Sequence, residues 1–245
     1  MDIFAQLTAE ISRVVLGKDE QVRQALCCLL ARGHLLIEDV PGVGKTTLSQ
    51  AFAKVTGLSY QRMQFTSDLL PSDILGVSIF DRNSNAFHFH AGPVFTQFLL
   101  VDEINRASPK TQSALLEAMA EKQVTVEGET RILPTPFFVM ATQNPWFQSG
   151  TFPLPESQLD RFLMRISLGY PDEQSERRLL AGGDPRLVID ELRPLLNAEK
   201  IIALQAMVDK IEIRDSVLSY VQRLIAFTAK IPTMPLDFLP ALPWP

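Results

Sequence analysis

The chain has 245 residues, of which 46% are hydrophobic and 21% charged, with a formal net charge of −5. This composition predicts a globular protein with one sizeable core and a smaller second unit. The acidic balance argues against broad nucleic-acid affinity, which needs a concentrated basic face. The N-terminus has no basic region before an apolar stretch, and no segment approaches the length of a membrane span. We therefore expect a cytoplasmic protein without a membrane segment.

Helical and extended patterns alternate through the first two thirds of the chain. Residues 1–33 show helical apolar spacing with a break at 14–17, and the first expected strand follows directly. The short apolar runs typical of buried parallel strands lie at 34–37, 60–65, 94–101 and 137–141. This alternation predicts an α/β fold with a doubly wound parallel sheet.

The cysteines are two adjacent residues, Cys27 and Cys28, in an apolar helical run. Adjacent cysteines provide neither a disulfide framework nor the spacing of a metal site. We expect both to be buried thiols.

A glycine-rich turn, Glu38-Asp-Val-Pro-Gly-Val-Gly-Lys-Thr-Thr47, joins the first expected strand to a helix and matches the P-loop pattern. In that pattern backbone N–H groups surround the phosphates, a lysine reaches the β and γ oxygens, and a hydroxyl binds Mg²⁺. Asp39 stands where the pattern has its first glycine, so we expect it to adopt a turn geometry that Asp tolerates. The predicted nucleotide-binding residues of the loop are Pro41, Gly42, Val43, Gly44, Lys45, Thr46 and Thr47.

Two later strands end in polar residues. The run 98–103 ends in Asp102 and Glu103, a pairing that after a P-loop is typical of an NTPase. We predict that Asp102 binds Mg²⁺ together with Thr46, and that Glu103 is the general base that activates water. A further buried strand leads to Asn144, which is placed to contact the γ-phosphate and the attacking water; a helix cap or turn is the alternative.

Two segments, 77–89 and 124–133, have the pattern of hairpins inserted into the sheet plan. Inserted hairpins usually take part in function, and surface decoration is the alternative. Further on, Arg161 and Arg165 are one helical turn apart beside acidic residues, which a local charge cluster also explains.

Past residue 170 the pattern becomes helical, with amphipathic segments at 173–180, 198–210 and 214–230. We predict a nucleotide-binding core at 1–170, a partial helical lid at 171–231 and a proline-rich apolar tail at 232–245. Such a tail cannot continue a helix.

The order and spacing of four motifs closely resemble a MoxR-family AAA+ ATPase. They are the P-loop, Asp102-Glu-Ile-Asn-Arg-Ala107, Ala141-Thr-Gln-Asn-Pro145 and Pro153-Leu-Pro-Glu-Ser-Gln-Leu-Asp-Arg-Phe162, and the resemblance spans residues 1–230. It implies that Arg161 is an arginine finger acting on ATP bound by the next subunit of a ring, expected to be a hexamer. It also implies that Asn144 is the sensor 1 residue, that Gln64 is a polar switch, and that the adenine packs on Val15, Leu16 and Gly17.

In this family the two hairpins resemble the helix-2 insert and the pre-sensor-1 insert, which face the pore or the client in related motors. The family's lid continues into a segment carrying sensor 2, which has no counterpart after residue 230 in this sequence. We therefore expect an incomplete lid, from a truncation or frameshift, with weaker ATP binding and slower hydrolysis than a completed one.

The resemblance implies an ATPase that uses ATP and Mg²⁺ for chaperone-like remodelling of client proteins, often metal-dependent enzymes or complexes. A von Willebrand factor A-type protein is the partner expected in this family. A helicase-type nucleic-acid motor and a metal-chelatase motor subunit are the alternatives. The first hairpin carries only Arg82, His88 and His90 as basic residues, too little charge to follow a phosphate backbone.

Overall fold

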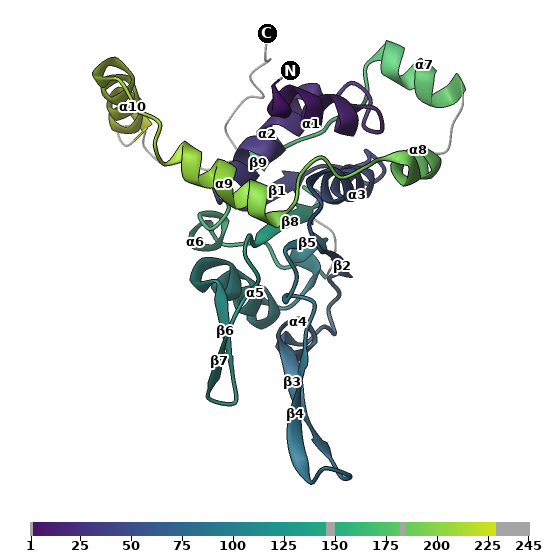
Figure 1. Cartoon of the computed structure of the whole chain (residues 1–245), viewed down its shortest axis with the longest axis vertical. Helices are drawn as coiled ribbons and strands as arrows, with labels where there is room; N and C mark the ends of the chain where they lie inside the picture. The colour runs from purple at the N-terminus through teal and green to yellow at the C-terminus, as the bar shows by residue number, and fades with distance from the viewer. Residues whose placement is uncertain (1, 146–149, 182–184, 229–245) are drawn as a thin grey trace. The chain divides into compact units, whose positions relative to one another are not determined.

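The computed structural model describes residues 2–145, 150–181 and 185–228 (Figure 1). Its contacts divide the chain into two compact units, residues 1–208 and 209–245. The sequence-based boundaries after residues 170 and 231 stay predictions, and the tail expected at 232–245 lies outside the described residues.

The first unit is built on a five-stranded parallel sheet with the strand order β2-β5-β8-β1-β9. This sheet confirms the predicted α/β fold. Because all its strands run the same way, the loops that follow them meet at one edge of the sheet. The strands are β1 (Leu35–Glu38), β2 (Tyr60–Gln64), β5 (Phe98–Asp102), β8 (Phe138–Gln143) and β9 (Met164–Ile166).

Each central strand is buried on both faces, which explains why these strands read as continuous apolar runs. In β5, Phe98 and Leu100 belong to one hydrophobic cluster, while Leu99 and Val101 belong to the other. The strand expected at 94–101 begins only at Phe98, since the residues before it form turns, with the Phe95 N–H donating to the carbonyl of Gly92. Alternate side chains thus fill two cores, one on each face of the sheet.

Helices α1 (Ile3–Ser12), α2 (Asp19–Leu30) and α3 (Lys45–Thr56) contribute to the first core. There Phe52 of α3 packs against Phe98 and Phe138, with ring centroids 5.5 and 5.6 Å away. Such aromatic pairs add about 0.5–1.5 kcal/mol each beyond their area burial. They seat α3, and with it the loop before Lys45, firmly on the sheet.

The second core is covered by α5 (Pro109–Glu121). Its first turn is set by sequence: Ser108 is the N-cap and its hydroxyl accepts a hydrogen bond from the Thr111 N–H, while Pro109 occupies the first helical position. Both choices favour a helix start.

Two antiparallel hairpins project in the same direction from this unit (Figure 1), and both were predicted from sequence. The first pairs β3 (Gly76–Asp81) with β4 (Ala86–Ala91) and follows the short helix α4 (Pro71–Leu75). The second pairs β6 (Gln123–Val126) with β7 (Glu129–Ile132).

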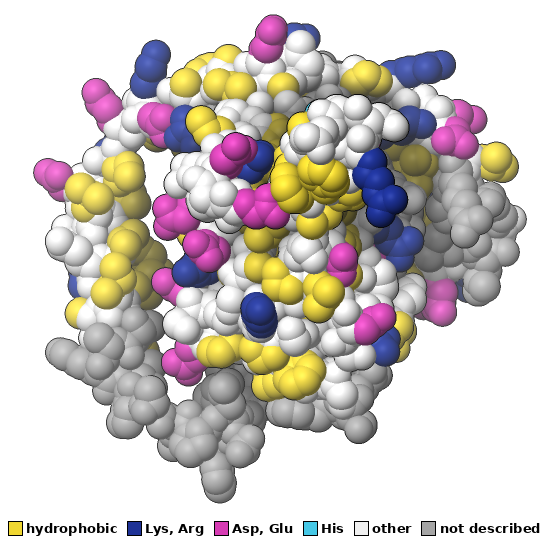
Figure 2. All heavy atoms as spheres, turned by 90° about the horizontal axis from the view of Figure 1, so that it is seen from below, with side chains coloured by type: hydrophobic (Ala, Val, Ile, Leu, Met, Phe, Trp, Pro, Cys, Tyr) yellow, Lys and Arg dark blue, Asp and Glu magenta, His cyan; other side chains and the backbone are white. Residues whose placement is uncertain are grey.

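A cation–π contact joins the two hairpins, because the guanidinium carbon of Arg131 lies 3.9 Å from the centroid of the Phe89 ring. Seen from the side toward which the hairpins project, exposed hydrophobic side chains gather on the surface (Figure 2). On the first hairpin the exposed hydrophobic side chains are Val77, Ile79, Phe80 and Phe87.

The remaining helices of the first unit are the short η1 (Ile104–Arg106) and α6 (Glu156–Leu159), then α7 (Glu173–Ala181), α8 (Pro185–Glu191) and α9 (Ala198–Val208). In the second unit, α10 (Asp215–Thr228) is amphipathic and exposes Val217, Leu218, Val221, Leu224 and Ile225. Among the residues that the structure describes, no helix is both long and apolar enough to cross a membrane.

The expectation that both cysteines of α2 are buried is wrong. Cys28 is buried, and burial raises the pKa of its thiol to about 12, but Cys27 is exposed. Neighbouring residues on a helix point about 100° apart, so Cys28 faces the core on which α2 packs and Cys27 does not.

Candidate nucleotide site

The loop between β1 and α3 has the backbone geometry of a phosphate-binding turn. Gly42 and Gly44 have φ angles of 88° and 93°, which strain any residue with a side chain. A Cβ at either position would meet no atom within 4 Å, so the backbone conformation, and not lack of space, requires glycine here. Since α3 begins at Lys45, its N-terminal N–H groups lie beside the loop, as anion binding needs.

The side chain of Asp39 ties this loop to the segment after β9. Its carboxylate accepts hydrogen bonds from the N–H of Val40 at 2.8 Å, the hydroxyl of Ser167 at 3.0 Å and the N–H of Gly169 at 2.6 Å. Burial alone would raise the pKa of this carboxyl, but these hydrogen bonds, led by that of Gly169, bring the pKa below its ordinary value.

Asp39 therefore fills the first position of the P-loop pattern in a way that the sequence did not reveal. We expected a special turn geometry at this residue, and that expectation is wrong, because Asp39 is not among the residues with positive φ. The position is occupied by a hydrogen-bonding carboxylate that replaces glycine without backbone strain.

Lys45 folds over its own loop. Its ammonium donates to the backbone carbonyls of Asp39 at 2.6 Å and Val40 at 2.9 Å. Burial lowers the pKa of Lys45, and the nearby carboxylates of Asp39, Asp102 and Glu103 oppose that shift. The cation thus lies between the glycine-rich turn and the acidic strand ends.

A hollow of about 160 Å³, which we call the phosphate pocket, opens beside Lys45. It brings together Lys45, Thr46, Asp102, Glu103 and Asn144, which the sequence assigned to phosphate, metal and water. Hydroxyl and carboxylate oxygens are the hard donors that Mg²⁺ prefers, so Thr46 and Asp102 fit this ion. The pocket is lined by Pro41, Lys45, Thr46, Arg62, Gln64, Asp102, Glu103, Thr142, Gln143 and Asn144.

Glu103 is held in an uncommon conformation at the end of β5. Its φ of 56° and ψ of 52° lie in the left-handed region, where residues with a side chain are rare and concentrate at functional sites. Its N–H donates to the hydroxyl of Thr142 at 3.0 Å. Its Oε2 accepts from the amide of Gln64 at 2.8 Å and from Arg106 at 2.9 Å. The residue is therefore held by groups from three different segments, of which Gln64 and Arg106 contact the carboxylate.

The carboxylate of Asp102, which we predict to bind Mg²⁺, has a partner that the sequence analysis missed. Nε of Arg62 lies 2.7 Å from Oδ2 of Asp102, and the hydroxyl of Thr142 donates to Oδ1 at 3.3 Å. In the sheet, Gln64 of β2 pairs with Asp102 of β5. Arg62 precedes Gln64 by two residues and therefore shares its face of the strand. Because alternate residues of a strand share a face, the two-residue spacing from Gln64 could have identified Arg62 as a neighbour of Asp102.

A second hollow, of about 240 Å³, lies on the other side of the glycine-rich turn. It brings the predicted adenine-side residues Val15 and Leu16 against the loop and, with its mainly apolar wall, suits a flat base. Gly17 adjoins this wall at φ 72°, and a Cβ there would lie 2.5 Å from Oγ of Ser175. The lining residues are Val14, Val15, Leu16, Lys18, Gly42, Val43, Gly44, Thr47 and Pro171.

Arg161 lines neither hollow of its own chain. Its side chain is exposed, and its guanidinium donates to the carbonyl of Leu116 in α5 at 2.7 Å. Its assignment as an arginine finger stays a prediction, in which the guanidinium acts on the site of a neighbouring subunit.

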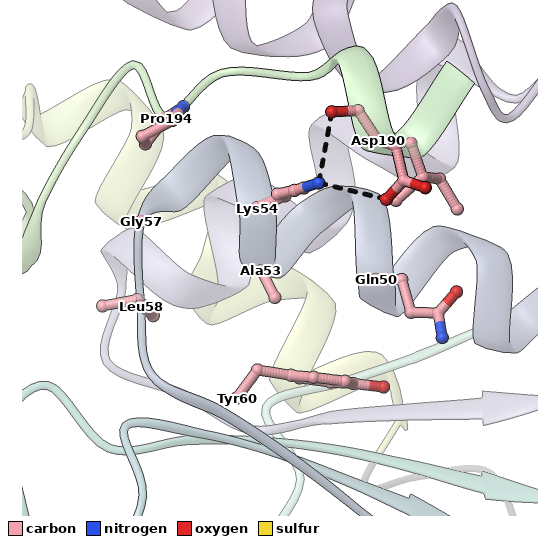
Figure 3. Close-up of a pocket in the computed structure, with 9 residues that line it drawn as sticks. Gln50, Ala53, Lys54, Gly57, Leu58, Tyr60, Asp190 and Pro194 are labelled. Carbon is pink, nitrogen blue, oxygen red and sulfur yellow. Dashed lines mark hydrogen bonds and ion pairs between the residues drawn. The ribbon is translucent and has the colours of Figure 1, made fainter. Parts of the chain in front are cut away.

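A wider pocket, of about 710 Å³, lies between the end of α3, the start of β2 and α8 (Figure 3). Its walls include Ala53, Leu58 and Tyr60. Nζ of Lys54 lies 3.4 Å from both the backbone carbonyl oxygen and Oδ1 of Asp190. The wall contains neither the glycines of the P-loop nor the carboxylates of β5. The two hollows that flank the P-loop are therefore the candidate nucleotide site.

Comparison with known proteins agrees with this geometry. Residues 34–164 match the model of the ATPase family associated with various cellular activities (AAA). The chain is 46% identical over 238 residues to the uncharacterized protein YeaC of Bacillus subtilis, covering 97% of this chain and 74% of YeaC. It is 42% identical over 223 residues to Chaperone MoxR1 of Mycobacterium tuberculosis, covering 90% of this chain and 58% of MoxR1.

A crystal structure of a Cytophaga hutchinsonii protein, named as a candidate ATPase, superposes with a TM-score of 0.80 at 38% identity. The match covers 91% of this chain and 68% of that one. Fold and glycine-rich loop together define the class of α/β P-loop ATPase cores. Within that class, the chain belongs to the MoxR family of AAA+ ATPases. It spans little more than half of MoxR1, so the activity and partners of the whole protein are matters for proposal.

Proposed function

We propose that this chain binds ATP with Mg²⁺ and hydrolyses it to ADP and phosphate. The observation that carries the proposal is the convergence of Lys45, Thr46, Asp102, Glu103 and Asn144 on one small pocket. These residues come from three separate stretches of sequence: the start of α3, the end of β5 and the residue after β8. A coincidental turn rich in glycine does not explain why the acid and amide groups meet there.

Each group has a distinct task in this proposal. Lys45 balances phosphate charge, and Thr46 and Asp102 hold the Mg²⁺ shell, whose ion would neutralise the charge on the phosphates. Glu103 accepts the proton of the attacking water, and Asn144 positions that water. The hydrogen bonds of Gln64 and Arg106 keep the carboxylate of Glu103 pointed into the pocket.

Binding of a fluorescent ATP analogue and release of phosphate test these assignments. Lys45→Ala should abolish binding, whereas Glu103→Gln should bind normally and hydrolyse at least about 100-fold more slowly. Lys54→Ala is the matched control, since it removes a lysine of the same helix outside the phosphate pocket. Undiminished binding by Lys45→Ala would disprove the site.

We further propose that ATP turnover drives remodelling of a client protein by a ring of subunits, with six as the expected number. Arg161, which lines neither hollow of the nucleotide site in its own chain, would act on the next subunit's nucleotide. The projecting hairpins, with Val77, Ile79 and Phe87 exposed, are the surface suited to an apolar client segment. The expected clients are metal-dependent enzymes or complexes, with a von Willebrand factor A-type partner, in the cytoplasm.

Two other motor functions use a similar plan, a helicase-type motor on nucleic acid and a chelatase motor subunit. The net charge of −5 and the apolar hairpin surface oppose the first. Salt-dependent retention on single-stranded DNA would favour the helicase-type motor, and ATP-dependent metal insertion into a porphyrin would favour the chelatase.

The client function is tested with the hydrolysis-deficient Glu103→Gln chain as bait. A protein retained only with ATP, and lost when Phe87→Ser is added, supports client binding by the hairpin. Phe87→Ser on its own should keep full ATPase activity, because this side chain is 69% exposed and lines neither hollow of the nucleotide site. A protein that is retained equally without ATP and after Phe87→Ser is added would contradict the proposal.

A further inference from the structure

The ion pair of Arg62 and Asp102 lies inside the phosphate pocket, and the nucleotide roles assigned above leave it unexplained. The Asp102 side chain is only 8% exposed and lies at the end of β5, an interior strand that pairs with β2 and β8. Arg62 stands on β2, the last strand of the sheet, and its side chain is 48% exposed. The carboxylate is thus fixed in the core, while the guanidinium has an open path to solvent.

Both oxygens of the Asp102 carboxylate are engaged. Arg62 contacts Oδ2 at 2.7 Å, and the hydroxyl of Thr142 donates to Oδ1 at 3.3 Å. A carboxylate so shielded from water needs a cation or several donors beside it, and Arg62 supplies the cation.

The same carboxylate is the one proposed to hold the Mg²⁺ shell. A guanidinium and a divalent cation that compete for one carboxylate repel each other strongly at such short range, since little water separates them. Lys45 already adds a positive charge to the pocket. Simultaneous occupancy of Asp102 by Arg62 and by the ion is therefore unfavourable.

We propose that Arg62 is a displaceable counter-ion, which neutralises Asp102 until Mg²⁺ arrives with nucleotide and then gives up the carboxylate. The inference rests on the proposed nucleotide function and deepens it, because it makes the requirement for Mg²⁺ adjustable by one residue on an edge strand. The edge position allows this exchange, since the guanidinium leaves without disturbing the central strands.

A purely structural role of Arg62 predicts the opposite effect of its loss on Mg²⁺ binding. If Arg62 only braced β2 against β5, its loss would disorder Asp102 and weaken Mg²⁺ binding. The backbone already pairs these strands from Tyr60 with Phe98 to Gln64 with Asp102. As a competitor, Arg62 weakens Mg²⁺ binding, and its loss should strengthen it.

The test titrates Mg²⁺ into the full 245-residue chain with a fluorescent ADP analogue held at constant concentration. In Arg62→Gln the half-saturating Mg²⁺ concentration should fall about threefold to tenfold, the range expected for a partly exposed, charged hydrogen bond. Arg62→Lys keeps the charge, so its half-saturating Mg²⁺ concentration should lie between those of wild type and Arg62→Gln. Arg177→Gln, which removes an exposed ion pair on α7, is the matched control and should match wild type.

Thermal unfolding gives a second readout that needs no turnover. In EDTA without nucleotide, Arg62→Gln should melt below wild type, because Asp102 has lost its counter-ion. With saturating Mg²⁺ and ADP the difference in melting temperature should disappear, since the ion then neutralises Asp102 in both proteins.

The possible failures separate the two proposals. If wild type binds the analogue with Mg²⁺ but Arg62→Gln needs as much Mg²⁺ or more, the counter-ion role is overturned and the nucleotide function stands. If wild type and Arg177→Gln both fail to bind the analogue at any Mg²⁺ concentration, the nucleotide function falls, and this inference with it.

Discussion

The carboxylate of Asp39 accepts a 2.6 Å hydrogen bond from the backbone N–H of Gly169, a residue 130 positions further along the chain. The bond joins the phosphate-binding loop to the segment that leads from β9 to α7. Close by, Lys18 at the start of α2 donates to the carbonyl of Tyr170 at 2.7 Å, so α2 and the P-loop hold the same short segment.

Asp39→Asn should weaken this connection while keeping the size of the side chain. Because charged hydrogen bonds become neutral ones and the amide presents fewer acceptors, we expect a loss of about 1–3 kcal/mol in the free energy of unfolding. Urea denaturation measures the loss. Asp190→Asn, which alters a carboxylate 80% exposed on α8, should change the same quantity by less than about 0.5 kcal/mol.

Gly44→Ala should damage nucleotide binding through the backbone alone. The φ of 93° at Gly44 is strained for alanine by about 1–2 kcal/mol, although a Cβ there would meet no neighbour. We expect a loss of that size in the free energy of unfolding and at least about tenfold weaker nucleotide binding, because relief of the strain displaces the N–H groups of the loop. Equilibrium binding of a fluorescent nucleotide decides the matter, and unchanged affinity would contradict this reading of the loop.

Arg161→Ala should lower ATP turnover by about 10³-fold or more, but only in the assembled ring, if the side chain serves a neighbouring subunit. Subunits carrying Arg161→Ala, mixed with subunits carrying Glu103→Gln, should regain part of the activity, since each supplies what the other lacks. Phosphate release across a series of mixing ratios measures this. Failure to recover activity in demonstrably mixed rings would remove support for a role in trans.

His34 should make the fold sensitive to mild acid. Its buried ring accepts the N–H of Val139 at Nδ1, 3.0 Å away, and Nε2 lies 3.3 Å from the carbonyl of Met119, an arrangement that suits the neutral ring. Burial lowers the pKa of His34 from 6.5 to about 4; the bond to Met119 opposes this shift and the charge of Lys122 adds to it.

Since the unfolded chain takes up a proton near pH 6.5 and the folded chain only near pH 4, the contribution of His34 to stability is complete above pH 6.5. It is lost as pH falls toward 4. A pKa difference of about 2.5 corresponds to about 3 kcal/mol. Urea denaturation between pH 7 and 4.5 should show a shallower pH dependence for His34→Gln than for wild type. Parallel curves would show that His34 is not the titrating group.

The sequence predicted the parts of the fold that depend on local pattern. Four of the five sheet strands, both hairpins and helices α1, α2, α3, α7, α9 and α10 follow from apolar period and turn residues, whereas the range of α5 was not predicted. The P-loop, Asp102, Glu103 and Asn144 were recognisable because each follows a buried strand, and parallel strands bring such ends to one edge.

What the sequence concealed depends on tertiary pairing. The strand β9 has three residues and forms only by pairing with β1, so the spacing of Arg161 and Arg165 resembled a helical charge cluster. The helix α8 lies between two of the predicted helical segments and was not predicted; it begins at Pro185, and proline is common at the first position of a helix. Likewise, nothing local to Asp39 or Arg62 points to Gly169 or Asp102, since sheet register and loop closure create those contacts.

The contact of Arg131 with the ring of Phe89 has a mechanical consequence. Two separate hairpins anchored only at their bases would bend independently under load, and a pull on one would leave the other at rest. With the guanidinium of one hairpin seated on the aromatic ring of the other, sideways force is shared between both anchoring points, at α4 and at α5. A force applied to either hairpin is therefore also borne by the other.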